Sequence, residues 1–220
     1  MQPIACPETN DFTTPNQPLD NLAAALKAGG PIDILAIGSA STVAHGKAGF
    51  PYQMVDALQA GLPKATFRLT VKGNRGLTAA DMYEELRTGL ARERYRLVLW
   101  QTGTVEAVRG TRPDDLREVL EEGADLVAAQ GGNLILIDPQ FSRFLRANTD
   151  LEPYKQAMET AAEVPGADLF RRFELMHSWA QDGALDLERT APKEQETAVR
   201  TLNACLGEAL AKFVLNGVGG

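Results

Sequence analysis

The amino-acid sequence predicts an α/β domain built on a five-stranded parallel sheet. Short apolar runs rich in β-branched residues alternate along the chain with longer segments of helical periodicity. This alternation is typical of βαβ units, which bring strands together in parallel with helices over the faces of the sheet. No internal repeat, low-complexity tract or linker interrupts it. We therefore expect a single domain at residues 18–220, after an extended lead-in at residues 1–17 that contains three prolines.

In the first half of the chain, the first helix is predicted at residues 18–30, because Pro18 favours a first helical turn and a Gly-Gly pair ends it. Residues 32–38 (IDILAIG) have the β-branched, glycine-terminated form of a buried parallel strand. The small residues that follow predict a loop at 38–49. The remaining elements expected here are a helix at 52–60, a strand at 65–71, the loop KGNRG, and a helix at 78–95 with Asp81 in its first turn.

The second half continues the alternation. Residues 96–103 (RLVLWQTG) predict a third strand, in which Trp100 is expected to fill the core. A helix at 112–130 begins with Pro113 and two aspartates, which suit the first turn of a helix. The elements expected after it are a strand at 133–139, a helix at 151–162, a strand or extended segment at 167–173, and helices at 173–180 and 195–215.

Composition and charge exclude several classes of function. Of the 220 residues, 22 are Lys or Arg and 29 are Asp or Glu, for a net charge of −7. Partners such as nucleic acid or an anionic membrane require a basic face instead. No apolar run approaches the roughly 20 residues of a membrane helix, so no transmembrane segment is expected. Two cysteines and two histidines argue against a zinc ribbon or multi-histidine site, and nucleotide-binding glycine motifs are missing, so we expect no metal and no cofactor.

A ligand site is expected where the parallel strands end. Ligands of open α/β sheets bind beyond the carboxyl ends of the strands, which selects the loops at residues 38–46, 73–76, 103–110 and 138–142. A catalytic serine would have to be one of four residues, Ser39, Ser41, Ser142 or Ser178. Ser39, Ser41 and Thr42 also suit a helix N-cap or a turn, so their presence alone does not indicate chemistry.

Three of these loops resemble sequence blocks of the SGNH (GDSL-type) hydrolases. ILAIGSASTVAHG is similar to the first block, a strand followed by G-[DS]-S-x-T. LTVKGNRGLTAADM resembles the second block, whose G-x-x-G ends in a glycine that donates a backbone N–H to the oxyanion. LVLWQTGTVEAVRG resembles the third block, W-Q-x-G-T-N, and DPQFSRF and DLFRRFELMHSW are similar to connecting segments. The resemblance covers nearly the whole chain and implies a three-layer α/β/α sandwich with a flavodoxin-like sheet.

The resemblance places several catalytic positions of the family on residues of different chemistry. The nucleophilic serine corresponds to Ala40, and the asparagine of the third block corresponds to Val105. The glycine framework is kept at Gly73, Gly76 and Gly103, with Gly76 at the oxyanion position. Alanine has no atom that can attack an acyl carbon, and valine cannot donate a hydrogen bond to an oxyanion.

The acid–base pair of the family's last block is also replaced. That block, D-x-x-H, precedes a C-terminal helix, and counting back without a gap places the pair on Glu194 and Thr197. A shifted alignment uses Asp186 and Arg189. Neither alignment supplies a histidine to take a proton near neutral pH. The resemblance therefore implies a pseudoenzyme of the cell envelope that binds an acylated or glycan ligand, or a protein partner, in the ancestral active-site groove.

Two other functions stay open at this point. An active acyl-ester hydrolase (an esterase or deacetylase) would need a relocated pair, Ser39 or Ser41 with His45, within hydrogen-bond reach of one another. A structural subunit of an envelope complex would leave the groove unused. The second histidine, His177, is expected to pack against the fold or to cap a helix.

Other charged residues have both a binding and a structural interpretation. Asp138 ends a strand at the ligand face, but Asp-Pro is also a common turn. Arg109 and Arg112 are candidates for holding an anionic ligand, and the alternative is that both are solvated. An acidic helix face is expected at the surface, formed by Glu118, Glu121 and Glu122.

Cys6 and Cys205 lie near opposite ends of the chain. A disulfide between them would tie the lead-in, which otherwise has little to hold it, to the last helix. Two separate buried thiols, or a lipid-attached Cys6, are the alternatives. Disulfides persist in oxidising compartments, which favours the periplasm or secretion. The first residues lack the apolar core of a signal peptide, so we expect a mature chain from which the signal has been removed.

Overall fold

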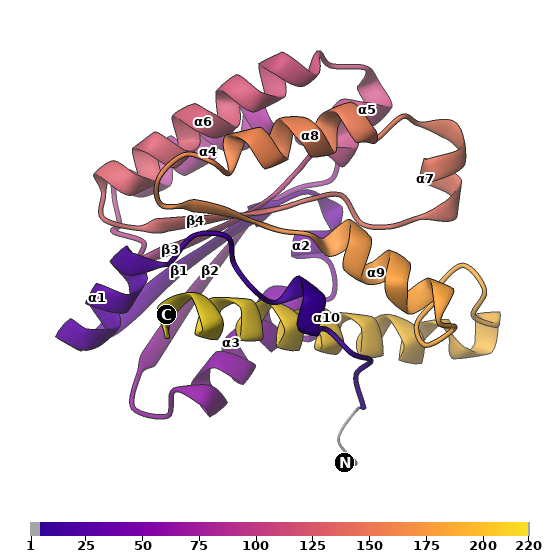
Figure 1. The fold of residues 1–220 in the computed structure, drawn as a ribbon, viewed down its shortest axis with the longest axis horizontal. Helices are drawn as coiled ribbons and strands as arrows, with labels where there is room; N and C mark the ends of the chain where they lie inside the picture. Colours follow the sequence, from indigo (N-terminus) through magenta and orange to yellow (C-terminus); the bar gives the residue numbers. More distant parts are fainter. Residues whose placement is uncertain (1–4, 220) are drawn as a thin grey trace.

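A computed structural model describes residues 5–219 and contains one five-stranded sheet between two helical layers (Figure 1). The strands are β1 (Pro31–Gly38), β2 (Thr66–Gly73), β3 (Leu97–Gln101), β4 (Asn133–Ile137) and β5 (Ala167–Phe170). Every neighbouring pair is parallel, in the order β2-β1-β3-β4-β5. This arrangement confirms the predicted α/β class and its flavodoxin-like strand order.

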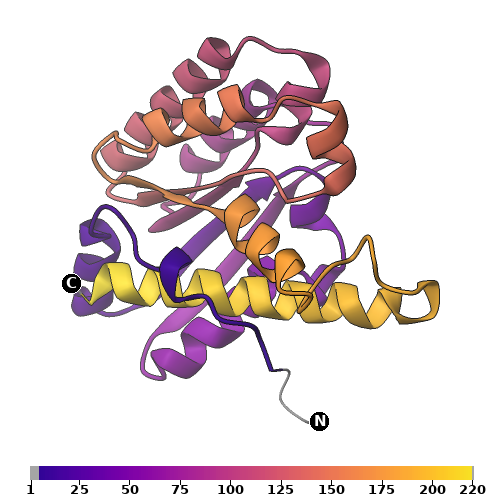
Figure 2. The same ribbon diagram turned by 45° about the vertical axis from the view of Figure 1, so that its right-hand side comes forward.

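Helices cover both faces of the sheet, as Figures 1 and 2 show from two directions. One layer consists of α1 (Asp20–Ala28), α3 (Phe50–Gly61) and α10 (Gln195–Val218), and the other of α4 (Ala79–Leu90), α6 (Pro113–Ala129) and α8 (Glu152–Ala161). All residues of β3 and β4 are buried between the layers, which explains why LVLWQ and NLILI are almost entirely apolar. Within residues 5–219, no helix is long and apolar enough to cross a lipid bilayer.

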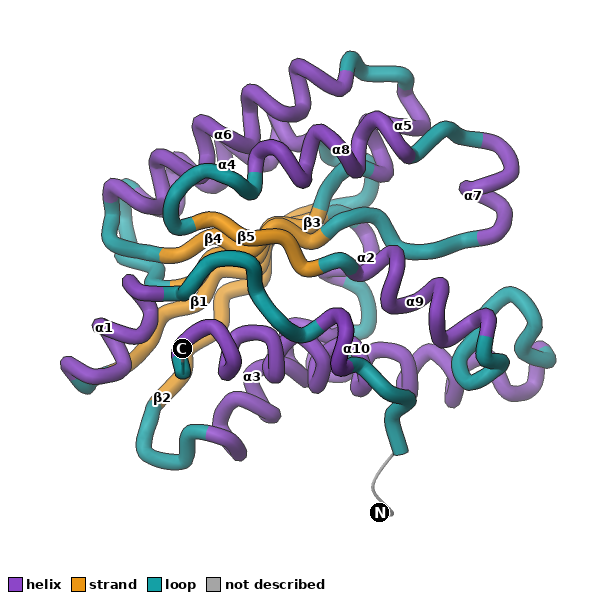
Figure 3. The backbone as a smooth tube through the Cα atoms, viewed as in Figure 1, coloured by secondary structure: helices purple, strands orange, loops and turns teal. Residues whose placement is uncertain are grey.

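Short helices occupy the regions that were expected to be loops. The predicted loop at 38–49 contains α2 (Ala40–Val43) and the 3-10 turn η2 (Gly46–Ala48), so that prediction is wrong. Two further short helices, α5 (Thr104–Arg109) and α7 (Arg143–Asn148), follow β3 and β4. Each of these helices has six residues or fewer, which is too short for a helical period to be recognised in the sequence. Figure 3 distinguishes them from the surrounding loops.

Two predicted elements extend too far. The helix expected to reach residue 95 ends at Leu90, because the N–H groups of Arg92 and Glu93 bond to Gly89 O and the chain turns toward β3. The strand expected to reach residue 173 ends at Phe170, and the next helix, α9 (Arg172–Gln181), begins two residues later. Residues 172 and 173 are therefore helical.

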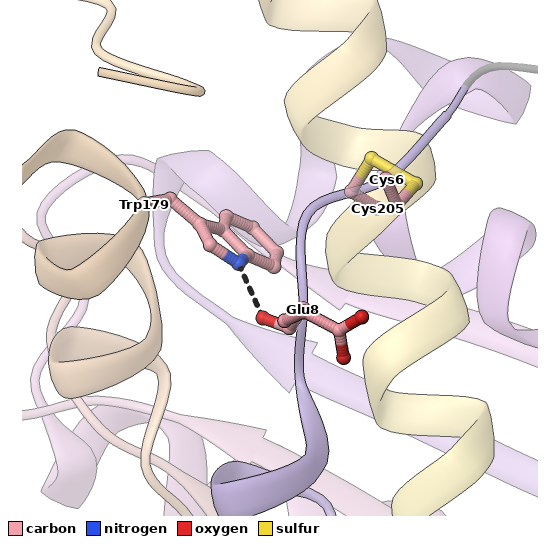
Figure 4. Close-up of a disulfide and its surroundings, with 4 residues drawn as sticks. All are labelled: Cys6, Glu8, Trp179 and Cys205. Carbon is pink, nitrogen blue, oxygen red and sulfur yellow. Dashed lines mark hydrogen bonds between the residues drawn. A yellow bond between two sulfur atoms is a disulfide. The ribbon is translucent and has the colours of Figure 1, made fainter. Parts of the chain in front are cut away.

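The Cys6–Cys205 disulfide joins the lead-in to α10, with the two Cα atoms 5.3 Å apart (Figure 4). This confirms the predicted pairing. The expectation that the lead-in has little else to hold it is wrong. The indole N–H of Trp179 on α9 donates to Glu8 O at 3.1 Å (Figure 4), and the 3-10 turn η1 (Asn10–Phe12) also packs against α9. The described part of the lead-in, residues 5–17, is thus held by contacts beyond the disulfide.

Candidate functional site

A groove lies beyond the carboxyl ends of β1 and β3, where the strand order changes direction. The last residues of three strands, Gly38, Gly73 and Gln101, are register neighbours, so the loops that follow them emerge side by side. The groove has a volume of about 720 Å³. Its lining includes Ser39, Ala40, Gly76, Gln101, Val105 and Arg172. This is the place where open α/β sheets bind ligands.

Three positions carried over from the family line this groove together. Ala40 is the first residue of α2, Gly76 follows β2, and Val105 lies on α5. Gly73 and Gly103 shape the neighbouring loops instead. Gly73 has a φ of +133°, and a Cβ at this position would collide with Gly38 O, so glycine is required for β1 and β2 to end side by side.

Three hydroxyl groups of the first loop converge on one oxygen atom, Oε1 of Gln101. The donors lie at 3.1, 3.0 and 2.9 Å and are the hydroxyls of Ser39, Ser41 and Thr42, respectively. An amide oxygen accepts hydrogen bonds but does not take up a proton near neutral pH. Gln101 therefore holds the loop without activating a serine. No role was predicted for Gln101, although it matches the glutamine of the third block and is the polar end of the apolar strand LVLWQ.

Neither histidine hydrogen-bonds to Ser39 or Ser41 in the part of the chain that the structure describes. His45 is exposed before η2, with a left-handed φ of +69°. His177 lies on α9, where its ring stacks on Phe141 with centroids 4.6 Å apart, and its Nε2 is 3.2 Å from a guanidinium nitrogen of α7. The relocated Ser–His pair is thus not assembled in this arrangement.

The positions carried over for the acid–base pair lie outside the groove. Glu194 and Thr197 border a separate depression, and so do the residues of the shifted alignment, Asp186 and Arg189. This depression and the groove share no lining residue. The segment that contains Asp186 is bonded to the start of α7, because Nη2 of Arg143 donates to Asp186 Oδ2 at 2.7 Å.

A buried arginine lies at the bottom of the groove. Arg172, the first residue of α9, is 2% exposed, and its Nε donates to Asp138 O at 3.1 Å. Its Nη1 donates to Ser41 Oγ at 3.2 Å, whereas Nη2 is buried and has no hydrogen-bond partner among residues 5–219. Burial lowers the pKa of Arg172 to about 10, so the side chain stays charged at neutral pH. Arg172 was not predicted, because the sequence Arg171-Arg172 does not indicate which of the two arginines is buried.

The side chain of Asp138, at the end of β4, is buried beside this arginine and does not line the groove. Burial raises the pKa of Asp138 to about 7, and the Phe173 N–H, 2.8 Å from Oδ1, and the charge of Arg172 offset part of the effect. The bond to Phe173 fixes the start of α9 against β4. Asp138 therefore positions Arg172, which supports the structural interpretation of this residue.

A second buried carboxylate, Glu106, joins two of the loops. It accepts hydrogen bonds from the backbone N–H of Ala79 at the start of α4 and from that of Gly103, the latter at 2.9 Å. It thereby fixes α5, which carries Val105 and Arg109, beside α4. Glu106 was not predicted either, since a single acidic residue in a short helix is expected to be exposed at the surface.

The remaining charged candidates differ in whether they line the groove. Arg109 lines the groove, and its Nη2 donates to Gly76 O at 2.9 Å. Arg112 is exposed outside the groove, and its Nε lies 3.8 Å from Asp115 Oδ1. The acidic face is on α6, also outside the groove, and consists of Glu118, Glu121 and Glu122.

Comparison with known proteins identifies the same architecture. The model of the Non-GDSL lipase-like family matches residues 5–220. The fold is similar to that of a catalytic mutant of Axe2, an acetylxylan esterase from Geobacillus stearothermophilus, with a TM-score of 0.65 and 18% identity over 87% of this chain and 95% of that chain. No curated protein sequence matches this chain.

Two further solved structures share the fold. A member of the lipolytic protein G-D-S-L family from Veillonella parvula matches with a TM-score of 0.59 and 15% identity, over 78% of this chain and 94% of its own. TesA matches with a TM-score of 0.58 and 20% identity, over 77% of this chain and 94% of its own. The resemblance found in the sequence blocks is thereby confirmed at the level of family and fold.

Proposed function

Because this chain belongs to the Non-GDSL lipase-like family, we propose that it is a pseudoenzyme that binds an acylated ligand in the groove beside Ala40 without hydrolysing it. The observation that carries this proposal is Ala40 itself, which lines the groove at the position that the resemblance assigns to the nucleophilic serine. Alanine offers no nucleophile, and the hydroxyls of the flanking serines bond to an amide oxygen.

The other replaced positions support the same proposal. Val105 lines the groove at the position assigned to the oxyanion-binding asparagine, and its side chain has no hydrogen-bond donor. Two Axe2 variants with alanine in place of a serine and of a histidine are each described as catalytic mutants. In this chain the resemblance assigns the family's nucleophilic serine to Ala40 and, by the ungapped count, its histidine to Thr197.

Exposed apolar side chains support binding. Among residues 5–219, the large hydrophobic side chains with high exposure are Val43, Val108 and Phe144. Val108 is 61% exposed and Phe144 is 71% exposed, and both line the groove. Apolar side chains gathered at the rim of a concave site are typical of ligand binding and are costly in water without a ligand. An acyl chain is the part of a ligand that such a rim would cover.

The disulfide supports a location in the cell envelope or outside the cell. Cys6 and Cys205 are joined, and disulfides persist in oxidising compartments. The proposal therefore places the protein in the periplasm or among secreted proteins.

The absence of catalysis can be tested with a fluorophosphonate probe at neutral pH, followed by the intact mass of the protein. We expect no covalent adduct under conditions in which an active SGNH hydrolase is labelled completely. An adduct mapped to Ser39 or Ser41 would show an activated serine and would refute the pseudoenzyme proposal.

Binding can be tested by calorimetric titration with methyl decanoate and with an acetylated xylooligosaccharide. We expect at least one of them to bind, and Ala40→Leu, which fills part of the groove, to weaken that binding. Val43→Leu is the matched control, because Val43 lies on the same helix, is exposed and does not line the groove. Failure of both ligands to bind, or equal effects of the two substitutions, would contradict the proposal.

A further inference from the structure

Three arginines and no acidic residue line the groove beside Ala40. They are Arg75 in the loop after β2, Arg109 on α5 and Arg172 on α9. None of the three forms a salt bridge with a carboxylate among residues 5–219. The chain as a whole has a net charge of −7. Its surface on average repels anions, whereas this groove attracts them.

Arg172 has hydrogen-bonding capacity left at the bottom of the groove. Its Nε and Nη1 bond to Asp138 O and Ser41 Oγ, while its buried Nη2 has no partner in the described part of the chain. The Asp138 carboxyl lies beside this charge but does not bond to Nη2, and a buried donor without a hydrogen-bond partner is unfavourable. A carboxylate or phosphate oxygen in the groove would supply that partner through a charge-assisted hydrogen bond.

The hydroxyl groups next to Arg172 can adjust to such a ligand. Three hydroxyls share Gln101 Oε1, but an amide oxygen has two lone pairs, so one hydroxyl is available as a donor. Ser39 and Ser41 line the groove. Rotation of either hydroxyl toward the ligand would place a neutral donor close to the guanidinium group.

The groove also has an apolar portion, contributed by two helices. Val105 and Val108 lie on α5, and Phe144 and Leu145 lie on α7. An inorganic anion would leave these side chains in water, whereas a neutral acyl chain would bring no anionic group to the arginines. A ligand that satisfies both portions combines an anionic group with an alkyl chain.

We infer that the groove binds an amphipathic anion, namely a carboxylate or a phosphate monoester carried by an alkyl chain. Its anionic head pairs with Arg172 and is assisted by Arg75 and Arg109, and its chain covers the apolar residues of α5 and α7. This inference rests on the proposed function and specifies the ligand. The alkyl portion takes the place that the proposed function gives to the acyl chain, and the preferred molecule carries a free acid group in addition.

A ligand series tests the charge and the chain separately by calorimetric titration, with each amphipathic anion below its micelle-forming concentration and methyl decanoate below its solubility limit. Decanoate and decyl phosphate present the two anionic heads, and methyl decanoate has the same chain without a charge. Acetate and inorganic phosphate present the heads alone. We expect one or both amphipathic anions to bind about tenfold or more tightly than methyl decanoate, and the bare heads to bind more weakly still.

Variants then locate the head group. Arg75 and Arg109 are exposed, so Arg75→Gln and Arg109→Gln should fold, and we expect both to weaken binding of the anion several-fold more than binding of methyl decanoate. Arg112→Gln is the matched control, because Arg112 is exposed outside the groove. Arg172→Gln should abolish the preference for the anion. If that variant does not fold, the two exposed variants and the ligand series still decide the question.

The possible results separate the two claims. Equal affinity for both anions and for methyl decanoate would overturn the anion site and leave acyl binding intact. Equal weakening by Arg109→Gln and Arg112→Gln would overturn the site as well, because it would reflect the net charge of the protein. If no alkyl ligand binds, the amphipathic-anion site is overturned, and the proposed function fails as well if the acetylated xylooligosaccharide does not bind either.

Discussion

Ala40 lies between two serines whose hydroxyl groups bond to Gln101, and no residue that lines the groove is a histidine. Substituting Ala40→Ser would add a hydroxyl at the nucleophile position but no group that removes its proton. Loss of the base alone costs on the order of 10⁶ in turnover. We therefore expect Ala40→Ser to hydrolyse p-nitrophenyl acetate no faster than the unchanged protein.

A second variant tests the position of the base. Ala40→Ser combined with Thr197→His supplies both side chains, but Thr197 borders a depression that shares no residue with the groove. We expect the double variant to be inactive as well, when it is measured beside an active SGNH hydrolase. Esterase activity in the double variant would show that the two positions come together in solution.

The buried carboxyl of Asp138 makes stability depend on pH. Burial raises its pKa from 3.8 to about 7 in the folded protein, so between these values the folded state binds a proton that the unfolded state does not. The stabilisation of the folded state by this bound proton is therefore complete below pH 3.8 and is lost as the pH rises through about 7. Between pH 5 and pH 8 we expect this carboxyl to lower the free energy of unfolding by about 2–3 kcal/mol.

Urea unfolding of the unchanged protein and of Asp138→Asn at both pH values measures this effect. The asparagine keeps an oxygen for the Phe173 N–H but does not titrate. The loss of stability between pH 5 and pH 8 should be smaller in the variant by that amount. Parallel pH profiles would contradict a raised pKa at Asp138.

At the scale of elements, α6 packs against β3 through a close contact between Gly123 and Trp100. A Cβ at position 123 would collide with Cζ3 of the Trp100 ring, which is fully buried. Gly123→Ala should therefore lower the free energy of unfolding by about 1–3 kcal/mol, although alanine favours a helix. Thermal and urea unfolding of the variant check this value.

The matched control is Gly89→Ala in α4. A Cβ at Gly89 would meet its nearest neighbour, Lys72 Nζ, at 3.5 Å, an ordinary contact distance. Without a collision, the helical preference for alanine should raise stability by up to about 1 kcal/mol. Equal effects of the two substitutions would show that the contact with Trp100 does not limit the approach of α6.

The elements that could be predicted from the sequence are those long enough to show a period. All five strands and the long helices, such as α6 and α10, follow from their apolar patterns. The short helices α2 and α5 could not be predicted, because their few residues fit a loop equally well. These short helices place Ala40 and Val105 in the groove.

The residues of the candidate site also fall into those that could be predicted from the sequence and those that could not. Motif resemblance brings Ala40, Gly76 and Val105 together, and the structure places all three on the groove. Arg172 and Glu106, the buried charged residues that hydrogen-bond to the loops of the site, could not be predicted. Their roles depend on burial and on partners from distant strands, and an isolated charged residue in the sequence indicates neither.

At the scale of the whole molecule, the disulfide connects residues that are 199 positions apart and ties the start of the chain to α10. The lead-in has independent contacts further along. Asn216 Nδ2 donates to Thr13 O at 2.8 Å, and the Gln17 N–H donates to the Asp168 carboxylate at 2.8 Å. The disulfide and these hydrogen bonds should therefore act at different levels, one on global stability and the other on local order.

Replacing both cysteines by serine separates the two levels. A crosslink stabilises chiefly by restricting the unfolded chain, so Cys6→Ser with Cys205→Ser should lower the free energy of unfolding by about 2–5 kcal/mol. The backbone N–H of Gln17 should stay protected from hydrogen exchange, because its bond to Asp168 does not involve the disulfide. Urea unfolding and amide exchange of the double variant measure both effects. If the Gln17 N–H loses protection while the sheet keeps its own, the disulfide rather than the hydrogen bonds holds the lead-in against the fold.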